Sequence, residues 1–516
     1  MQKKSKFPSK KADTSHIIKP RVVHEWSDYQ KAIFDNMKNG SGNTAIIARA
    51  GASKTTSLVE SLRYLPRNKK TLVVAFNKSI ADELKTRVPD TIDCMTLHSL
   101  GFRAVKLKFG NNVSLDTNKC FNIVKNIVDD SNNYDLIMDV CKVVSFCKSS
   151  LIDIPSQISD LMDKHDIDPT PIDRVIFISY VCQALRKCKE QTTIVDYDDM
   201  IYFPFVYGLN VGKWDNILID ECQDLNKSQL IMALSAAKPN SRIFAFLDPE
   251  QAIYGFRCAD IESVNYIIDK LNPTKLSLPI SYRCPSSVIK MVNPLVPDIK
   301  SAPNAKAGEI HHIVPNDMMN KVKPGDFILS RTNAPLIKYC MALLRQMIPA
   351  NIRGRDVGAN LLYFVKKSKA KTIPKFLEYV KKWQELEVER LLAEKKPIDG
   401  CLDKAECFSN LCENATTIDE LKKTIEKLFN DIDDTKKVVL STTHKSKGDE
   451  RENVFVLRDS FRIWVYANTD ISNLKDPKLK EEYNVVYVAL TRAKDKLYIV
   501  SNKNAPTILD TPDKKI

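Results

Sequence analysis

A segment near the N-terminal end of the sequence joins an apolar run, a turn of small residues and a Lys-Thr pair. It reads AIIARAGASKTTSL over Ala45–Leu58. A strand that passes through such a turn into a helix presents backbone N–H groups and the positive end of the helix dipole to an anion. Lys54 would neutralise the β- and γ-phosphates of a nucleotide, and the Thr55 hydroxyl would bind Mg²⁺. The segment indicates a phosphate-binding loop.

The loop meets the P-loop pattern G-x-x-x-x-G-K-[ST] only in part. Ala48 and Ser53 stand where the pattern has glycine, so Gly51 is the one glycine of the loop. Glycine before the lysine tolerates backbone angles that a Cβ makes costly. Ser53 is small, and its hydroxyl could add a phosphate contact. We therefore expect the chain to hydrolyse nucleotide despite Ser53. Whether Ser53 weakens nucleotide binding is a separate question that the sequence does not answer.

A second chemical segment follows another predicted strand. NILIDECQD, over Asn216–Asp224, is an apolar run that ends in clustered acids. Asp220 at the strand tip can hold Mg²⁺ through water, and Glu221 can polarise an attacking water molecule. An acidic surface turn is the simpler interpretation, but the position after a buried strand and downstream of a Lys-Thr loop argues against it. The two segments together predict a site that hydrolyses a nucleotide with Mg²⁺.

Two sets of short apolar runs are needed to position these residues. Buried parallel strands are predicted at 45–48, 71–76, 216–220 and 242–248, and again at 326–330, 438–442, 453–457 and 496–500. The two sets predict an α/β fold with two doubly wound parallel-sheet units.

Both units are predicted to carry a helical insertion. In the second insertion Phe376, Val380 and Trp383 share one helix face, and Thr417 with Glu420 forms a capping box. The expected organisation is a basic disordered arm over 1–20, a first unit over 21–101 and 197–275 with insertion 102–196, and a second unit over 276–351 and 435–516 with the smaller insertion 352–434.

Charge and cysteine usage narrow the function classes. The 78 lysines and arginines exceed the 64 acidic residues by 14, which suits a polyanionic partner because contacted phosphates release counterions. A generally basic surface is the alternative. The 13 cysteines are scattered, as in a reducing compartment, and Cys401, Cys407 and Cys412 are too few for the usual four-ligand zinc or iron–sulfur site.

Neither a membrane span nor a secretory signal is expected. No apolar run approaches the ~20 residues of a spanning helix, and the basic segment MQKKSKFPSKK has no apolar core behind its charges. We expect the nucleus in a eukaryote, and the cytoplasm in a bacterium or for a phage protein.

Seven more segments follow in order along the chain. They are SDYQ (Ser27–Gln30), VAFNKSIADELK (Val74–Lys85), TLHSLGF (Thr96–Phe102), LDPEQAIYGFRCAD (Leu247–Asp260), LPISYRCP (Leu278–Pro285), STTHKSKGDE (Ser441–Glu450) and EEYNVVYVALTRAKDKLYIV (Glu481–Val500). With the two segments above, this series resembles the superfamily 1 helicases of the UvrD/Rep type, and most of all their F-box helicase branch. The resemblance implies two RecA-like P-loop NTPase domains with ATP in the cleft between them.

The resemblance also implies the roles of the nucleotide-site residues. Gln30 would pair with adenine, Tyr282 would stack on it, and Glu450 would contact the ribose. Glu221 would be catalytic, Gln251 would sense the γ-phosphate, and Arg283 and Arg492 would place positive charge on the transferring phosphoryl group. The loop residues that would enclose the phosphates are Ala50, Gly51, Ala52, Ser53, Lys54, Thr55 and Thr56. ATP and Mg²⁺ are the implied cofactors.

A nucleic-acid track needs aromatic faces and phosphate donors, because bases stack without regard to sequence. The aromatic residues at positions that face the strand in the family are Phe76, Tyr254 and Phe256. The polar residues that could contact phosphate or sugar are Asn77, Thr96, His98, Arg257, Thr442 and His444. Each aromatic could instead belong to the core. The IYGF form around Tyr254 resembles the 3′→5′ class, so the expected polarity comes from the family alone.

Three functions remain open at this point. The first is a DNA helicase or translocase of repair, recombination or replication, which would act on single-stranded DNA and its junctions with duplex and would have replication or recombination proteins as candidate partners. The second is a nucleic-acid-binding scaffold with an inactive ATPase, motivated by Ser53, and the third is an RNA-directed motor. The second insertion is short beside that of the bacterial family members, where it regulates unwinding and partner binding.

Overall fold

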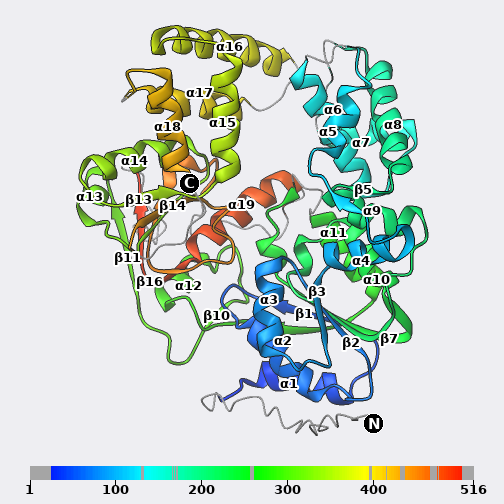
Figure 1. Cartoon of the computed structure of the whole chain (residues 1–516). Coiled ribbons are helices and arrows are strands. Elements are labelled where there is room, and N and C mark those ends of the chain that lie inside the picture. The colour runs from blue at the N-terminus through cyan, green and yellow to red at the C-terminus, as the bar shows by residue number, and fades with distance from the viewer. Residues whose placement is uncertain are drawn as a thin grey trace, which may run out of the picture.

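The computed structural model describes residues 25–502 except 130–132, 166, 168, 170–171, 256–260, 394–397, 414, 430–435, 465–473 and 475. The expected basic arm and the predicted strand contacts Phe256 and Arg257 lie outside these residues. In the described part, two six-stranded parallel sheets carry the fold, which confirms the predicted α/β class (Figure 1).

The first sheet has the strand order β3-β2-β6-β7-β1-β8. Its strands are β1 (Thr44–Ala48), β2 (Thr71–Ala75), β3 (Asp93–Thr96), β6 (Trp214–Ile219), β7 (Ala237–Leu247) and β8 (Thr274–Leu278). Successive side chains of a strand point to opposite faces, so Ile46 packs with one helical layer and Ala45 with the other. Burial on both faces explains why the strand segments are apolar without a polar alternation.

Helices cover both faces of this sheet. The layer that packs on Ile46 contains α1 (Asp28–Asn39), α2 (Lys54–Ser61) and α3 (Lys78–Arg87). The opposite layer contains α4 (Leu97–Phe109), α10 (Lys227–Ser235) and the end of α11 (Ile261–Leu271). Both the phosphate loop and Asp220 lie at the carboxyl ends of their strands, the edge at which open parallel sheets bind ligands.

The second sheet has the strand order β11-β16-β15-β12-β14-β13. Its strands are β11 (Glu309–Ile313), β12 (Phe327–Ser330), β13 (Ala350–Ile352), β14 (Val438–Thr442), β15 (Arg451–Leu457) and β16 (Ala493–Val500). On one face lie α12 (Ser286–Val292) and α19 (Pro477–Leu490), and on the other lie α13 (Pro315–Lys321) and α14 (Ala334–Arg345). The short strands β9 (Ile280–Ser281) and β10 (Lys300–Ser301) pair between the two sheets.

Both insertions are helical. The first contains α5 (Lys119–Lys125), α6 (Tyr134–Ser150), α7 (Pro155–Lys164) and α8 (Arg174–Glu190), which pack around a core of their own. At the base of these helices lie the paired strands β4 (Ser114–Leu115) and β5 (Ile194–Val195), followed by α9 (Tyr197–Val206). The second contains α15 (Arg355–Lys367), α16 (Ile373–Ala393), α17 (Asp399–Cys412) and α18 (Ile418–Leu428). As predicted, the three residues face one core: Phe376 and Val380 are buried in it, and Trp383 packs against it.

Of the two hydrogen bonds in the capping box predicted for α18, one forms and the other does not. The Thr417 hydroxyl accepts a hydrogen bond from the Glu420 N–H. The Glu420 carboxylate, however, reaches past Thr417 and accepts from both the N–H and the hydroxyl of Thr416. Two donors at Thr416 outcompete the single backbone N–H of Thr417.

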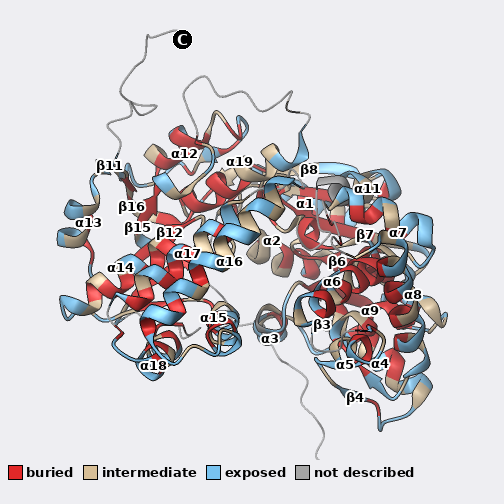
Figure 2. Ribbon diagram, turned by 90° about the horizontal axis from the view of Figure 1, so that it is seen from above, coloured by how far each residue is buried: buried red, intermediate tan, exposed pale blue. Residues whose placement is uncertain are grey.

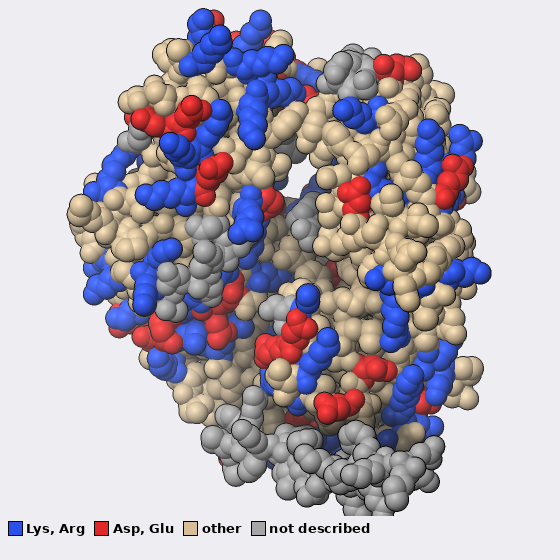
Figure 3. Space-filling view, viewed as in Figure 1, with Lys and Arg blue, Asp and Glu red and all other residues tan. Residues whose placement is uncertain are grey.

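The two sheet units lie side by side with α19 between them, and the insertions rise above them as two lobes (Figure 1). Buried residues line both sheets and the interior of each lobe (Figure 2). The two lobes touch where the rings of Tyr134 in α6 and Tyr363 in α15 stack with centroids 4.2 Å apart, and Figure 3 shows an opening between the lobes. Two of the predicted domain boundaries, at residues 275 and 351, fall inside the strands β8 and β13. The division of the chain into domains stays a prediction. None of the described helices is long and apolar enough to cross a membrane.

Candidate functional site

The phosphate loop between β1 and α2 has two residues in the left-handed region. Gly51 has φ 73°, and a Cβ there would lie 2.6 Å from both the Arg283 Cβ and the Ser281 Oγ. Only glycine fits at this close approach. Ser53 has φ 55°, a conformation that costs an L-residue about 1–2 kcal/mol. The sequence argument about the missing glycine therefore identified a strained position.

The first turn of α2 has no side-chain cap. Its N–H groups are left to an external acceptor, and together with the helix dipole they favour an anion. The turn begins with Lys54 and Thr55, so a bound phosphate would meet these two side chains as well as the N–H groups. Local geometry thus supports the anion-binding role expected of the loop.

Lys54 and Thr55 face the acidic end of β6. The Lys54 Nζ lies 2.6 Å from Glu221 Oε2, and the Thr55 hydroxyl donates to Asp220 Oδ2 at 3.4 Å. Burial would raise the pKa of Glu221, but Lys54 and then Lys447 outweigh it and lower that pKa to about 2. Glu221 is therefore ionised at neutral pH.

Mg²⁺ fits this pair of side chains chemically. The ion prefers oxygen ligands and takes one or two protein carboxylates with water and substrate phosphates. Asp220 and Thr55 offer a carboxylate and a hydroxyl on adjoining elements. Nowhere in the described chain do three or more His, Cys, Asp or Glu side chains form a metal site.

Gln251 lies beside this centre and is held by protein partners. It ends η3 (Pro249–Gln251), and its Nε2 donates to Asp248 Oδ2 at 2.6 Å. The Asp248 N–H donates to Gln223 Oε1 at 3.2 Å, and Gln223 Nε2 donates to Glu221 Oε2 at 2.6 Å. Lys447 binds the Gln251 carbonyl at 2.6 Å and Asp224 at 2.6 Å.

Three members of this network escaped the sequence analysis. Asp248, Gln223 and Lys447 lie inside segments already quoted for the family resemblance, but no role was predicted for them. Lys447 meets Asp224 from 223 residues away, and Asp248 meets Gln223 from 25 residues away, so spacing alone could not reveal these contacts.

The second unit places Arg283 against the same loop and Arg492 near Arg283. The Tyr282 N–H donates to the Gly51 carbonyl at 2.9 Å, which sets Arg283 against the loop, where its side chain pairs with Glu450. Arg492 is buried and donates to the Val488 carbonyl at 2.8 Å. Burial, and next the charge of Arg283, lower the pKa of Arg492 to about 10, so it keeps its charge at pH 7.

The predicted adenine contacts differ in accessibility. Tyr282 is 45% exposed and presents a face on which a base could stack. Gln30 is buried, its Oε1 accepts from the Ser27 N–H at 3.1 Å, and its Nε2 donates to Ser57 Oγ at 3.0 Å. Adenine binding by Gln30 would require an exchange of these partners.

Two of the three aromatic residues predicted to face a nucleic-acid strand, Phe76 and Tyr254, meet at the junction of the units. Phe76 and Tyr254 are half-buried and stack with centroids 6.1 Å apart and planes at 12°. The Tyr254 hydroxyl donates to the His444 carbonyl at 3.1 Å, and Lys447 Nζ lies 5.1 Å from the Tyr254 ring centroid.

The predicted polar strand contacts are placed less uniformly. Asn77 and Thr96 cap α3 and α4, and Thr442 is buried at the end of β14. His98 meets the ring edge of Tyr197. Burial, followed by the charge of Arg331, lowers the pKa of His444 to about 4. His444 is thus neutral at pH 7, and could offer phosphate an N–H but no charge.

Comparison with protein families matches this arrangement twice. The model described as the UvrD/REP helicase N-terminal domain matches residues 29–272, and the UvrD-like helicase C-terminal domain matches residues 355–504. The chain belongs to the UvrD/Rep helicase family. Membership accounts for the pairing of two parallel α/β units, and confirms the family predicted from the motifs.

Individual members of the UvrD/Rep family are similar at moderate identity. F-box DNA helicase protein 1 of Schizosaccharomyces pombe is 26% identical across 91% of this chain and 57% of its own length. The ATP-dependent DNA helicase Rep of Buchnera aphidicola subsp. Schizaphis graminum is 27% identical across 51% of this chain and 44% of its own. The ATP-dependent DNA helicase PcrA of Bacillus subtilis is 25% identical across 50% of this chain and 38% of its own length. The chain thus spans about half the length of the curated relatives it matches.

Proposed function

We propose that this chain is an ATP-driven motor that moves 3′→5′ along single-stranded DNA and unwinds the duplex ahead of it. One observation carries the proposal. Lys54 and Glu221 of the first unit face each other 2.6 Å apart, and the nearby Gly51 carbonyl accepts a hydrogen bond at 2.9 Å from the N–H of Tyr282, the neighbour of Arg283 in the second unit. A nucleotide bound at this loop would contact both units, so its hydrolysis could move one relative to the other.

Each residue of the centre has a proposed part in hydrolysis. Lys54 exchanges Glu221 for the β- and γ-phosphates, which leaves the Glu221 carboxylate to orient the attacking water. Arg283 and Arg492 place rigid guanidinium donors on the transferring phosphoryl group. Thr55 and Asp220 would hold Mg²⁺, which neutralises phosphate charge when bound.

The nucleic-acid side of the proposal rests on the aromatic pair and on positive charge. Phe76 belongs to the first unit and stacks on Tyr254, whose hydroxyl bonds to His444 of the second unit. Tyr254 lies three residues after Gln251, so a shift of Gln251 on nucleotide binding would also move the Tyr254 ring on which a base could stack. Exposed lysines gather on α15, on α16 and on the connection between them, at the upper left of Figure 3. They are Lys366, Lys367, Lys369, Lys371, Lys375, Lys381 and Lys382. The 3′→5′ direction, and action at junctions with replication or recombination proteins, are inferred from the family.

Removal of the Tyr254 ring tests the stacking surface. Tyr254→Ala should keep basal ATP hydrolysis but weaken strand affinity about five- to 150-fold, since a stacked base contributes ~1–3 kcal/mol. Tyr254→Phe is the matched control, because it keeps the ring and loses only the hydrogen bond to His444. Anisotropy of a labelled strand, basal hydrolysis and melting temperature are measured on one preparation. A less stable Tyr254→Ala protein with unchanged affinity per folded molecule would assign the ring to the core.

The function itself is tested by ATP hydrolysis with and without single strands. We expect single-stranded DNA to stimulate turnover, and unlabelled DNA to compete better than RNA of the same sequence. Preferential stimulation by RNA would indicate an RNA-directed motor. Strand binding without turnover would indicate a scaffold with an inactive ATPase.

A further inference from the structure

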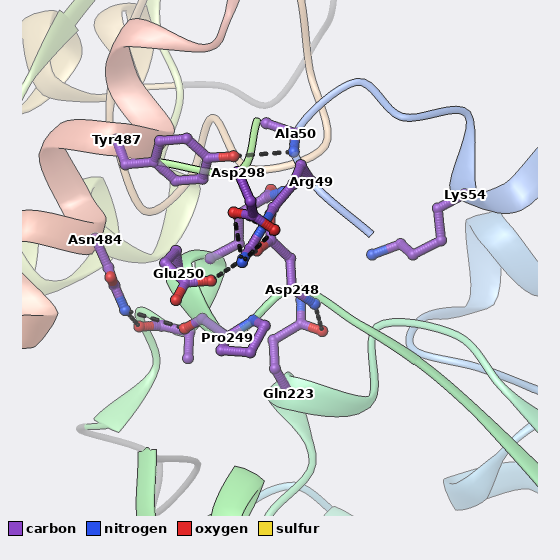
Figure 4. A network of polar contacts seen from close by, with 12 residues as sticks. Arg49, Ala50, Lys54, Gln223, Asp248, Pro249, Glu250, Asp298, Asn484 and Tyr487 are labelled. Atoms are coloured by element: carbon purple, nitrogen blue, oxygen red, sulfur yellow. Dashed lines mark hydrogen bonds and ion pairs between the residues drawn. The ribbon is translucent and has the colours of Figure 1, made fainter. Parts of the chain in front are cut away.

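Arg49, the residue between β1 and the phosphate loop, has no part in the function proposed above. Its side chain is 11% exposed and lies among three carboxylates (Figure 4). Nη1 donates to Asp248 Oδ1 at 3.1 Å and also contacts Glu250. Nε and Nη2 donate to the two oxygens of Asp298 at 2.9 and 3.0 Å, a bidentate pair.

These carboxylates belong to different units. Asp248 directly precedes η3 of the first unit, and Glu250 lies within it. Asp298 lies between Val296 and Ile299, which pack in the core of the second unit. Arg49 therefore joins the root of the phosphate loop to η3 and to the second unit at once. Burial alone would lower the pKa of Arg49, but Asp248 and Glu250 outweigh it and raise it.

The contact continues directly to Gln251. Asp248 is fully buried and uses one oxygen for Arg49 and the other for the Gln251 amide at 2.6 Å. Without the arginine, this carboxylate would be left beside Glu250 with its charge uncompensated, and an unpaired buried charge is costly. Arg49 thus fixes the side chain that orients Gln251.

Two neighbouring contacts tie the same elements to α19. The Ala50 N–H donates to the Tyr487 hydroxyl at 3.0 Å, and Asn484 Nδ2 donates to the carbonyls of Pro249 and Ala252 at 3.2 and 3.0 Å (Figure 4). These contacts hold both the phosphate loop and η3 against the second unit. Among the described residues, Arg49 is the side chain whose ion pairs join the root of the loop to η3 and to the second unit.

We propose that Arg49 is a positioning residue that orients Gln251 through Asp248 and makes this orientation depend on cleft closure through Asp298. The inference rests on the proposed function. Opening of the cleft would carry Asp298 away, and Arg49 would then relax toward Asp248 and Glu250. A lysine could not replace it, because a single ammonium lacks the fork that spans separate carboxylates.

A double-mutant cycle tests this coupling. Asp298→Asn alters the 48% exposed end of the network, and Arg49→Lys keeps the charge, so both variants should fold. Each should lower strand-stimulated turnover about fivefold or more, the lower range of coupling between sites, while the KM for ATP changes less than twofold. The double variant should be no worse than Arg49→Lys alone. Arg63→Lys with Glu60→Gln, a partly exposed pair on the same unit, is the matched control.

A second readout does not depend on hydrolysis. Fluorophores placed at the exposed positions Lys69 and Lys321 report the distance between the units without nucleotide, and Asp298→Asn should shift it toward longer values. Unchanged turnover in both single variants, additive losses in the double variant, or an unchanged distance would each overturn the role of Arg49. If the wild-type chain hydrolyses no ATP, the proposed function is contradicted. The distance measurement needs no hydrolysis, so it still tests whether the Arg49–Asp298 ion pair holds the units together.

Discussion

Lys54→Ala should abolish ATP hydrolysis while strand binding stays largely intact. Lys54 is the lysine at the end of the small-residue loop, and its ammonium reaches the acidic end of β6, 2.6 Å from Glu221. Without it, the β- and γ-phosphates would face Asp220 and Glu221 with no compensating charge from the loop. The aromatic pair Phe76 and Tyr254 is formed by other segments, so the strand surface should remain.

Steady-state hydrolysis with saturating single strand, and strand affinity without nucleotide, measure the two effects. Lys69→Ala, at an exposed position of the same unit, is the matched control and should leave both unchanged. Retention of half or more of the stimulated rate by Lys54→Ala would mean that the phosphate loop has been misplaced.

Glu221→Gln should bind ATP normally and turn over roughly 10²-fold or more slowly, as expected for loss of a group that orients the attacking water. Glu221 has φ 49°, and both Lys54 and Gln223 hold its carboxylate at 2.6 Å. The amide keeps the size of the side chain and can still accept a hydrogen bond, but it removes the charge that polarises water.

Single-turnover hydrolysis and binding of a fluorescent ATP analogue separate chemistry from affinity. Glu83→Gln on the exposed side of α3 serves as the matched control. A Glu221→Gln variant with near-normal kcat would remove Glu221 from the catalytic role, whereas lost binding with an unaltered single-turnover rate would assign it to nucleotide affinity.

Local patterns predicted the strands and the residues at their ends well. The runs predicted at 45–48 and 216–220 match β1 and β6 of one sheet to within two residues at each end. Lys54 lies beside Asp220 and Glu221 because parallel strands bring their carboxyl ends to one edge. Short strands such as β3 and β13 escaped detection, since three or four residues carry too little periodicity to distinguish them from loops.

Long-range charge pairs could not be predicted from the sequence. Arg49 was only one more residue of a small-residue loop until the fold placed Asp248 and Asp298 around it. The same holds for Gln30, whose amide is occupied by Ser27 and Ser57. Such partners depend on how two chain segments cross, which periodicity does not encode.

Unwinding of tailed duplexes tests the central claim most directly. The substrates are one duplex with a 3′ single-stranded tail, the same duplex with a 5′ tail, and a blunt form, each incubated with ATP or with a non-hydrolysable analogue. We expect the 3′-tailed duplex alone to be unwound, only with hydrolysable ATP, and with ATP turnover stimulated by the tail. Equal unwinding of the 5′-tailed duplex would contradict the direction, and tail binding without ATP-dependent strand separation would contradict the motor.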